Sequence, residues 1–201
     1  MQEFKNFKNT TQRQQFIKFL KNFGRDFVFM GLVIFGGLWF LGVVGKTNNH
    51  FACDAETVKQ KNRKNFFFKD GNYFTGGDLV SQDFVFEGKN SLLLNGENGY
   101  GFQLNYEYLK GNEEVVVWVW RYAEGDWKNA GQIVATVSGK FWKASQEIVE
   151  TKPSGWEKIQ LKFQVPEQTQ NEIMSVYCWN SQNQPIYFDD FHLVIQEKEE
   201  L

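Results

Sequence analysis

The sequence predicts an all-β fold, an antiparallel β-sandwich that follows one transmembrane helix. Two observations support this prediction. Residues 27–44 contain only apolar residues and glycine, and as a helix this run would be about 27 Å long, close to the thickness of the hydrocarbon core of a bilayer. Beyond residue 50, short segments of β-type residues are separated by turns rich in Gly, Asn and Asp, which is typical of a sandwich.

The charge around the apolar run predicts its orientation. Residues 1–26 contain six Lys or Arg and only two acidic residues, and positive charge is retained on the cytoplasmic side of membranes. We therefore expect a basic cytoplasmic segment (1–26), a transmembrane helix (27–45) and a domain on the other side. A cleaved signal peptide fits less well, because the basic leader is long and no A-x-A pattern follows the apolar run. Residues 10–24 have helical spacing typical either of an amphipathic helix on the inner leaflet or of a helical extension of the anchor.

The composition bounds the domain that follows. The net charge of the chain is −2 in spite of the basic leader, so the domain is acidic and does not resemble a nucleic-acid-binding protein. We expect a linker at 46–50, one domain over 51–196 and a solvated tail at 197–201. The two cysteines, Cys53 and Cys178, either form a disulfide, which a non-cytoplasmic compartment permits, or are small core residues.

The expected strands differ in what covers their faces. In 156–165 the apolar residues Ile159, Leu161, Phe163 and Val165 alternate with Lys or Gln, which predicts a strand with one face in water. In 114–122 both faces are apolar or aromatic, which predicts that the strand is covered on both sides or that one side is a binding surface. The other expected strands are 83–87, 91–95, 100–106, 132–137, 141–149, 172–180 and 185–195.

Several short motifs in the domain resemble those of a known superfamily. Gly155-Trp156-Glu157 opens an alternating strand that ends at a proline, and the stretch SVYCWNSQNQPIYFDDFHLVI carries Asp-Asp in the last strand. Together with Gly88-Lys89-Asn90-Ser91-Leu92, these resemble jelly-roll modules of the galactose-binding-like superfamily, which includes several carbohydrate-binding module families. The resemblance covers about residues 51–196 and implies a jelly roll. These motifs are also similar to those of cell-envelope proteins of Bacteroidetes-like bacteria. That similarity implies a bacterial inner membrane and a periplasmic domain.

The resemblance also implies one structural Ca²⁺. By position its ligands would be Glu56, backbone oxygens around Ser91, and Asp190, and oxygen ligands of this kind are what Ca²⁺ prefers. The tandem Asp189-Asp190 lies within an apolar strand, so one of the two carboxylates points inward and needs a partner. The alternative is a strand edge where both carboxylates reach water or a basic side chain.

Aromatic residues predict a surface that stacks against sugar rings. Trp118, Trp120 and Tyr122 alternate along one strand and lie on one face of it, where flat rings can pack on the apolar face of a pyranose. The alternative is that Trp118 and Trp120 fill the sandwich core, whereas Trp156 is expected to be structural. The full set of expected binding residues is Trp118, Trp120, Tyr122, Trp127, Trp142 and Trp179.

Motifs for catalysis are absent from the sequence. The chain has two histidines, His50 and His192, and neither a nucleophile motif nor a phosphate-binding glycine loop. We therefore expect no enzymatic activity, but a membrane-anchored, non-catalytic module that binds a carbohydrate or envelope glycan at the membrane surface. The alternative is an accessory or structural subunit of a membrane complex that uses the sandwich for contacts with a protein partner. In both cases one helix lies in the lipid bilayer, and no nucleic acid is involved.

Overall fold

The computed structural model describes residues 49–96, 98–125 and 131–197. The chain divides into two compact units, Met1–Lys46 and Thr47–Leu201, and all described residues lie in the second. The expected cytoplasmic segment, the transmembrane helix at 27–45 and most of the linker therefore lie outside the described residues. Within the part of the chain that is described, no helix is long and apolar enough to cross a bilayer.

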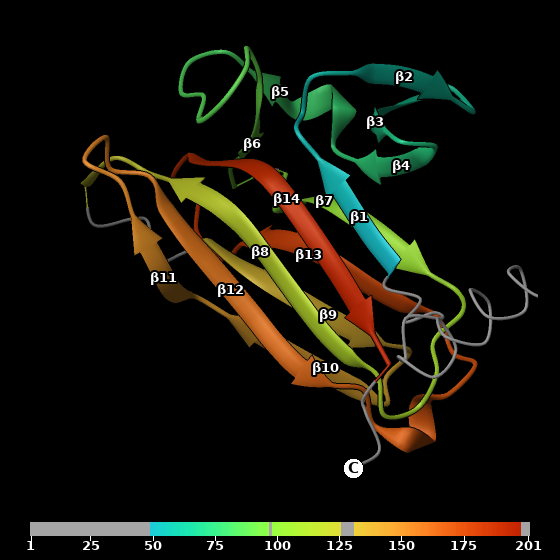
Figure 1. Cartoon of the computed structure of the whole chain (residues 1–201). Helices are drawn as coiled ribbons and strands as arrows, with labels where there is room; N and C mark the ends of the chain where they lie inside the picture. Colours follow the sequence, from blue (N-terminus) through green and yellow to red (C-terminus); the bar gives the residue numbers. More distant parts are fainter. Residues whose placement is uncertain (1–48, 97, 126–130, 198–201) are drawn as a thin grey trace, which may run out of the picture. The chain divides into compact units, whose positions relative to one another are not determined.

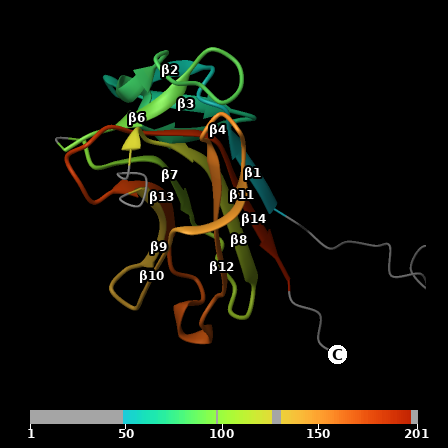
Figure 2. The ribbon, with the colours of Figure 1, turned by 90° about the vertical axis from the view of Figure 1, so that its left-hand side faces the viewer.

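The described residues form two main antiparallel sheets that face each other (Figures 1 and 2). The first sheet has the order β11-β12-β8-β14-β6-β5, with β1 also paired to β14. Its strands are β1 (Asn49–Cys53), β5 (Val80–Ser81), β6 (Ser91–Leu94), β8 (Glu114–Tyr122), β11 (Glu147–Thr151), β12 (Glu157–Gln164) and β14 (Ile186–Gln196). The second sheet has the order β10-β9-β13-β7. Its strands are β7 (Tyr100–Tyr106), β9 (Gly131–Val137), β10 (Phe141–Ser145) and β13 (Met174–Asn180).

The strand order is that of a jelly roll. Four strands of the first sheet lie in the order β6-β14-β8-β12, and the second sheet has the order β7-β13-β9-β10. The chain alternates between the sheets from β6 to β9, stays in the second sheet for β10, and alternates again from β12 to β14. Two nested Greek keys of this kind define the jelly roll, so the all-β sandwich expected from the sequence is confirmed for the described residues.

The core lies between the two sheets and follows the predicted alternation. In β12 the side chains of Ile159, Leu161 and Phe163 are buried, whereas the lysines and glutamines between them are not. In β8 the inward side chains are Val115, Val117 and Val119, which have no exposed surface. The valines, rather than the tryptophans, therefore fill the core, and Trp118 and Trp120 lie on the outer face of the first sheet.

Two expected strands differ from the structure. Residues 83–87 form an irregular loop, because their backbone N–H groups at Phe86 and Glu87 bind the carboxylate of Asp189 instead of a neighbouring strand. The expected strand 141–149 is two strands, β10 in the second sheet and β11 in the first, because the chain changes sheets at Gln146.

A third, small sheet was not expected from the sequence. It has the order β2-β3-β4 and consists of β2 (Val58–Lys61), β3 (Lys64–Lys69) and β4 (Asn72–Thr75). One face contributes Phe67 and Phe74 to the core, and both are fully buried. Two short 3₁₀ helices, η2 (Gly77–Leu79) and η4 (Glu167–Thr169), complete the regular structure of the described residues.

The two cysteines lie on strands of opposite sheets and do not form the disulfide that the sequence left open. Cys53 ends β1 and Cys178 lies in β13, and both are buried free thiols. Burial raises the pKa of Cys53 to about 12 and the pKa of Cys178 well above its ordinary value. Both side chains therefore stay as neutral thiols and act as small core residues.

Candidate functional site

The outer face of the second sheet carries a groove of about 370 Å³. Four aromatic side chains and three uncharged polar side chains line it: Tyr100, Gln103, Thr136, Trp142, Ser175, Tyr177 and Trp179. A site of this size, with several rings and a few hydrogen-bonding groups, has the general make-up of a small-molecule or carbohydrate site.

Strand alternation turns these side chains outward. In β13, Met174, Val176 and Cys178 point into the core and have no exposed surface, so Ser175, Tyr177 and Trp179 point the other way. In β10, Phe141 packs toward the core and contacts Phe163 of β12 at a ring-centroid distance of 5.0 Å, so its neighbour Trp142 faces solvent. The same backbone pattern that builds the core therefore builds the groove.

The register of the sheet places the groove side chains in two rows. In the first row, Trp142, Thr136, Ser175 and Asn105 are direct partners across all four strands. In the second row, Trp179 lies between Gln132 and Tyr100. The rows are four residues apart along β13, which is about 13 Å in a β-strand. The groove therefore extends along the strands and presents a ring at each end.

Exposure separates the rings that can receive a ligand from those that support them. The exposed fractions are 63% for Trp142, 60% for Tyr100 and 36% for Trp179. Tyr177 is half-buried and contacts Tyr100 edge-on, with ring centroids 6.1 Å apart. Desolvation raises the pKa of Tyr177, so its hydroxyl stays protonated at neutral pH and can donate a hydrogen bond.

The polar side chains at the groove are held by one another. Gln103 donates through Nε2 to Oδ1 of Asn105 at 3.0 Å, and Ser175 donates through Oγ to the same oxygen at 2.7 Å. These bonds fix the side-chain amide of Gln103, whose Oε1 atom can accept from a ligand hydroxyl. No Asp, Glu, His, Lys or Arg is among the lining residues, so the groove has no charged group with which to select an ion.

The groove contains only two of the six expected binding residues. Trp142 and Trp179 lie in the groove on the second sheet, whereas Trp118, Trp120 and Tyr122 lie on the outer face of the first sheet. Trp127 lies outside the described residues. The expectation that these rings share one surface is therefore wrong for the tryptophans of β8.

The rings at the C-terminal end of β8 are covered by the loop 82–90. Trp120 is 3% exposed and stacks on Phe86, with ring centroids 4.1 Å apart and planes 17° apart. Tyr122 stacks on Phe84 at 4.6 Å, and the buried Trp156 packs beside them. The structural role expected of Trp156 is confirmed, and the face that the sequence left open as a binding surface is closed at this end.

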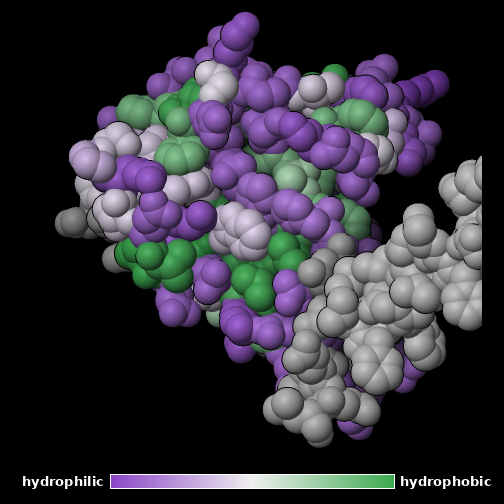
Figure 3. Space-filling model, in the orientation of Figure 1, coloured by the Kyte–Doolittle hydropathy of each residue, from purple (hydrophilic) through white to green (hydrophobic). Residues whose placement is uncertain are grey.

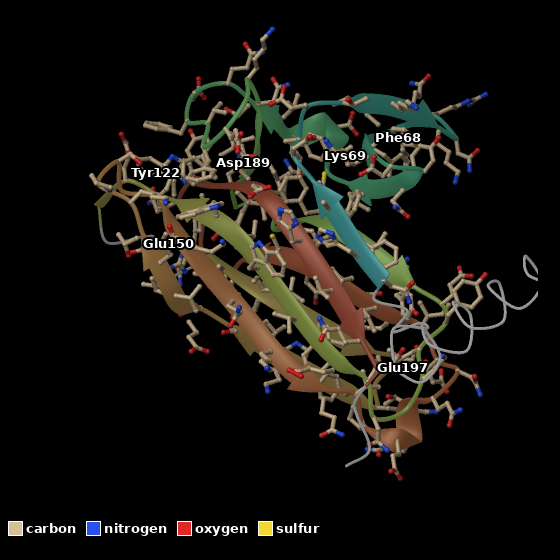
Figure 4. The ribbon with its side chains drawn as sticks, viewed as in Figure 1. Phe68, Lys69, Tyr122, Glu150, Asp189 and Glu197 are labelled. Atoms are coloured by element: carbon tan, nitrogen blue, oxygen red, sulfur yellow. The ribbon has the colours of Figure 1, made fainter. Side chains whose placement is uncertain are left out.

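Asp189 holds this loop in place (Figure 4). Its side chain is 1% exposed, and its Oδ2 atom accepts the backbone N–H groups of Phe86 at 3.0 Å and Glu87 at 3.2 Å. The Oδ1 atom accepts the N–H of Asp190 at 2.7 Å. Burial nevertheless raises the pKa of Asp189 to about 7, because desolvation outweighs the three hydrogen bonds.

Trp118 lies further along β8 in a different arrangement. It stacks on His192 with ring centroids 4.8 Å apart. Nε2 of His192 lies 2.8 Å from Oδ1 of Asp190, and its Nδ1 atom lies 2.9 Å from Nε2 of His50. His50, His192 and Asp190 therefore form a chain of side-chain contacts within hydrogen-bonding distance on the outer face of the first sheet, away from the groove.

The side chains of the three residues at the expected calcium site have other partners. Oε1 of Glu56 accepts the backbone N–H groups of Lys89 at 2.7 Å and Asn90 at 2.9 Å, so donor groups rather than carbonyl oxygens face this carboxylate. Ser91 donates to the carbonyl oxygen of Phe84 at 2.6 Å, and Asp190 pairs with His192. Within the described ranges, no group of three or more His, Cys, Asp or Glu is arranged to hold a metal. Calcium stays a prediction that the geometry of these side chains does not favour.

A buried ion pair lies between the sheets near the start of β9. Arg121 is 1% exposed, and its Nη2 atom donates to Oε2 of Glu157 at 2.8 Å while Nη1 donates to the carbonyl oxygen of Gly131. Nε of Arg121 has no hydrogen-bond partner. Desolvation lowers the pKa of Arg121, and the carboxylate of Glu157 compensates part of the cost of burying this cation.

Sequence reasoning missed five of the seven groove residues, namely Tyr100, Gln103, Thr136, Ser175 and Tyr177. One signal for them was present: in 172–180 the apolar Met174, Val176 and Cys178 alternate with Ser175, Tyr177 and Trp179. That alternation identifies a strand with an aromatic and polar outer face. It does not identify the neighbouring strands, which come from 100–106, 131–137 and 141–145.

Comparisons with known proteins add structural neighbours. No protein-family model and no curated protein matches the sequence. Among solved structures, the chain is similar to the CBM22-1 xylan-binding domain from Paenibacillus barcinonensis Xyn10C, with a TM-score of 0.46 and 15% identity over 78% of this chain and 100% of that domain. It is also similar to a cyclase from Fischerella sp. TAU (TM-score 0.43, 12% identity, 75% of this chain and 86% of that one). A third neighbour is the C-terminal CBM6 of LamC, a laminarinase from Zobellia galactanivorans (TM-score 0.37, 10% identity, 72% and 98%).

Proposed function

We propose that this chain is a membrane-anchored, non-catalytic module that binds a carbohydrate chain in the groove of the second sheet. The observation that carries the proposal is the lining itself, in which exposed rings and uncharged hydrogen-bonding side chains alternate across four strands. Sugar rings have apolar faces that pack on aromatic rings, and hydroxyl groups that need donors and acceptors. The uncharged lining favours a neutral glycan over an acidic one.

A binding role without catalysis is favoured by the same lining. General acid–base chemistry on a glycosidic bond needs a pair of carboxyl groups that flank the bond, and the groove residues include neither Asp nor Glu. The side chains that are present can orient a ligand and exclude water from one face of it. We assign the anchor to residues 27–45 and place the domain in the periplasm of a bacterial inner membrane, as proposals that rest on the apolar run and the charge around it.

The proposal is tested by measuring the binding of neutral polysaccharides, such as xylan or β-glucan, to the fragment 47–201. This fragment is a compact unit with its own core. We expect Trp142→Ala and Trp179→Ala each to weaken binding roughly fivefold, because one ring–ligand stack is worth about 1 kcal/mol. Isothermal titration calorimetry or affinity electrophoresis gives the affinities.

Two tyrosines provide a matched pair for the same assay. Tyr100→Ala removes a ring from the groove, whereas Tyr108→Ala removes a ring that is 77% exposed and lies outside it. We expect only the first change to weaken binding. Equal effects of the two changes, or full affinity after loss of both Trp142 and Trp179, would be incompatible with a binding site in this groove.

One observation favours the alternative, a subunit that contacts a protein partner. β11 is an edge strand of the first sheet, and all five of its residues are exposed, including Ile148 and Val149. A free edge of this kind can pair with a strand of another chain. Mild-detergent purification of the full chain tests it, and a partner that is lost after Val149→Pro, a change that blocks pairing at that edge, would favour the subunit role.

A further inference from the structure

The hairpin of β2 and β3 concentrates positive charge. The thirteen residues from 57 to 69 contain five Lys or Arg and no acidic residue, although the chain as a whole has more acidic than basic residues. Four of these cations, Lys59, Lys61, Arg63 and Lys64, are exposed, and we call them the basic hairpin. Among the ion pairs of the described residues, none includes a member of the basic hairpin. Figure 3 shows mostly hydrophilic side chains where β2 and β3 lie.

The hairpin carries this charge at a cost to its own stability. Lys61 and Lys64 are direct partners across the strands, and like charges in that position are destabilising. The two turn residues, Asn62 and Arg63, have φ angles of 50° and 64°, which asparagine tolerates and arginine does not favour. Neither feature contributes to folding, so the charge at this tip is better explained by something that it binds.

Aromatic rings lie on the same face as the lysines. Strand pairing sets Phe66, Phe68 and Tyr73 beside Lys59 and Lys61 on the outer face of the small sheet. The ring of Tyr73 contacts Phe68 at 5.0 Å and Phe66 at 6.0 Å, and Nζ of Lys59 lies 3.2 Å from the centre of the Phe68 ring (Phe68 is labelled in Figure 4). Half-buried rings beside exposed cations are typical of surfaces that rest in the headgroup region of a bilayer.

We propose that the basic hairpin binds the anionic headgroups of a lipid bilayer. The apolar run ends at Val44, thirteen residues before β2 begins, so a bilayer that holds this run would be present at high effective concentration. A nucleic acid is the other polyanion that such a surface fits. The bilayer is favoured because the proposed anchor would keep it close, and in this respect the inference rests on the proposed function. The inference goes beyond glycan binding, because the hairpin and the groove share no residue and are tested separately.

Binding to vesicles tests the proposal directly. The fragment 47–201 lacks the apolar run, so any association must come from the domain itself. We expect it to float with vesicles of phosphatidylglycerol and phosphatidylcholine, to ignore pure phosphatidylcholine, and to be released at about 0.5 M salt, where charge–charge attraction is screened. Each lysine near an anionic surface contributes about a fivefold gain in partitioning.

Charge-matched variants make the test specific. The triple change Lys59→Gln, Lys61→Gln and Lys64→Gln should weaken partitioning on the order of 100-fold. The control changes Lys140, Lys143 and Lys162 to Gln, which removes the same charge from β10, its preceding turn and β12. Equal losses in the two variants, equal binding to both kinds of vesicle, or preferential binding to an oligonucleotide over anionic vesicles would overturn the assignment. An unchanged melting temperature of the hairpin variant confirms that its fold is intact.

Discussion

The buried carboxyl group of Asp189 should make the stability of the domain depend on pH in an unusual direction. In the folded state its pKa is about 7, against an ordinary value of 3.8. Because the folded state binds this proton more tightly than the unfolded state does, the contribution of Asp189 to the free energy of unfolding is largest below pH 4. It then decreases as the pH rises from 4 to 7. At about 1.4 kcal/mol for each pH unit, the rise in pKa corresponds to a loss of about 4 kcal/mol by pH 8.

Urea denaturation of the fragment 47–201 between pH 4 and pH 8 measures this effect. The variant Asp189→Asn cannot ionise, so the difference in unfolding free energy between the wild type and this variant isolates the contribution of one carboxyl group. We expect that difference to decrease by up to about 4 kcal/mol across the range. Asp190→Asn is the matched control, because it removes a neighbouring carboxyl group that is partly exposed.

The hydrogen bonds to Asp189 oppose the effect of desolvation on its pKa, and the opposite pH dependence would result if they were the stronger effect. Three backbone N–H groups stabilise the carboxylate, and if they outweighed desolvation the folded pKa would lie below 3.8. A difference that stays constant or grows from pH 4 to pH 8 would show this. Fluorescence of Trp120, which the same loop covers, reports whether the loop 82–90 opens as Asp189 ionises.

Three further predictions concern packing, the buried ion pair and calcium. Gly77→Ala should destabilise the domain by about 2 kcal/mol or more, because the new Cβ would lie 2.6 Å from backbone atoms of Phe66; an unchanged melting temperature would contradict this. Glu157→Ala should cost about 3–5 kcal/mol in denaturation experiments, since it leaves the guanidinium of Arg121 buried without its carboxylate, and a loss below about 1 kcal/mol would show that Arg121 reaches water. Because Glu56 already accepts two N–H groups, we expect neither EDTA nor added Ca²⁺ to shift the melting temperature, whereas a rise with Ca²⁺ would show that oxygen ligands replace them.

The alternation of residues predicted the buried face of β12 but left open which face of β8 is buried, and the contacts that cover an outer face could not be read from it. In β12 the pattern of Ile159, Leu161 and Phe163 was sufficient, because the opposite face is charged and needs no cover. In β8 the outward rings are covered by a loop, and the residue that holds the loop, Asp189, is about a hundred positions away in the sequence. A local pattern carries no information about that contact.

For the groove, the sequence identified two of the ligand-facing residues but not their neighbours. Trp142 and Trp179 were expected to bind a ligand beside the tryptophans of β8. In the structure they lie in the groove, on the other sheet. Their actual neighbours, such as Tyr100, are set by the register of β13 against β7 and β9. Register depends on the fit of whole sheets across the core, which the spacing within one strand does not specify.

The pairing of β1 with β14 determines how the domain would carry mechanical load. β1 is the first described strand, and its five residues pair in antiparallel register with Phe191–Ile195 of β14, the strand that also pairs with β8. A force that enters the domain through residue 49 and acts along the axis of β1 would load these hydrogen bonds together, in shear, rather than break them one by one. Under the proposed function, in which residue 49 follows a tether and the groove binds a polymer, this pairing would strengthen the domain against a pull in that direction.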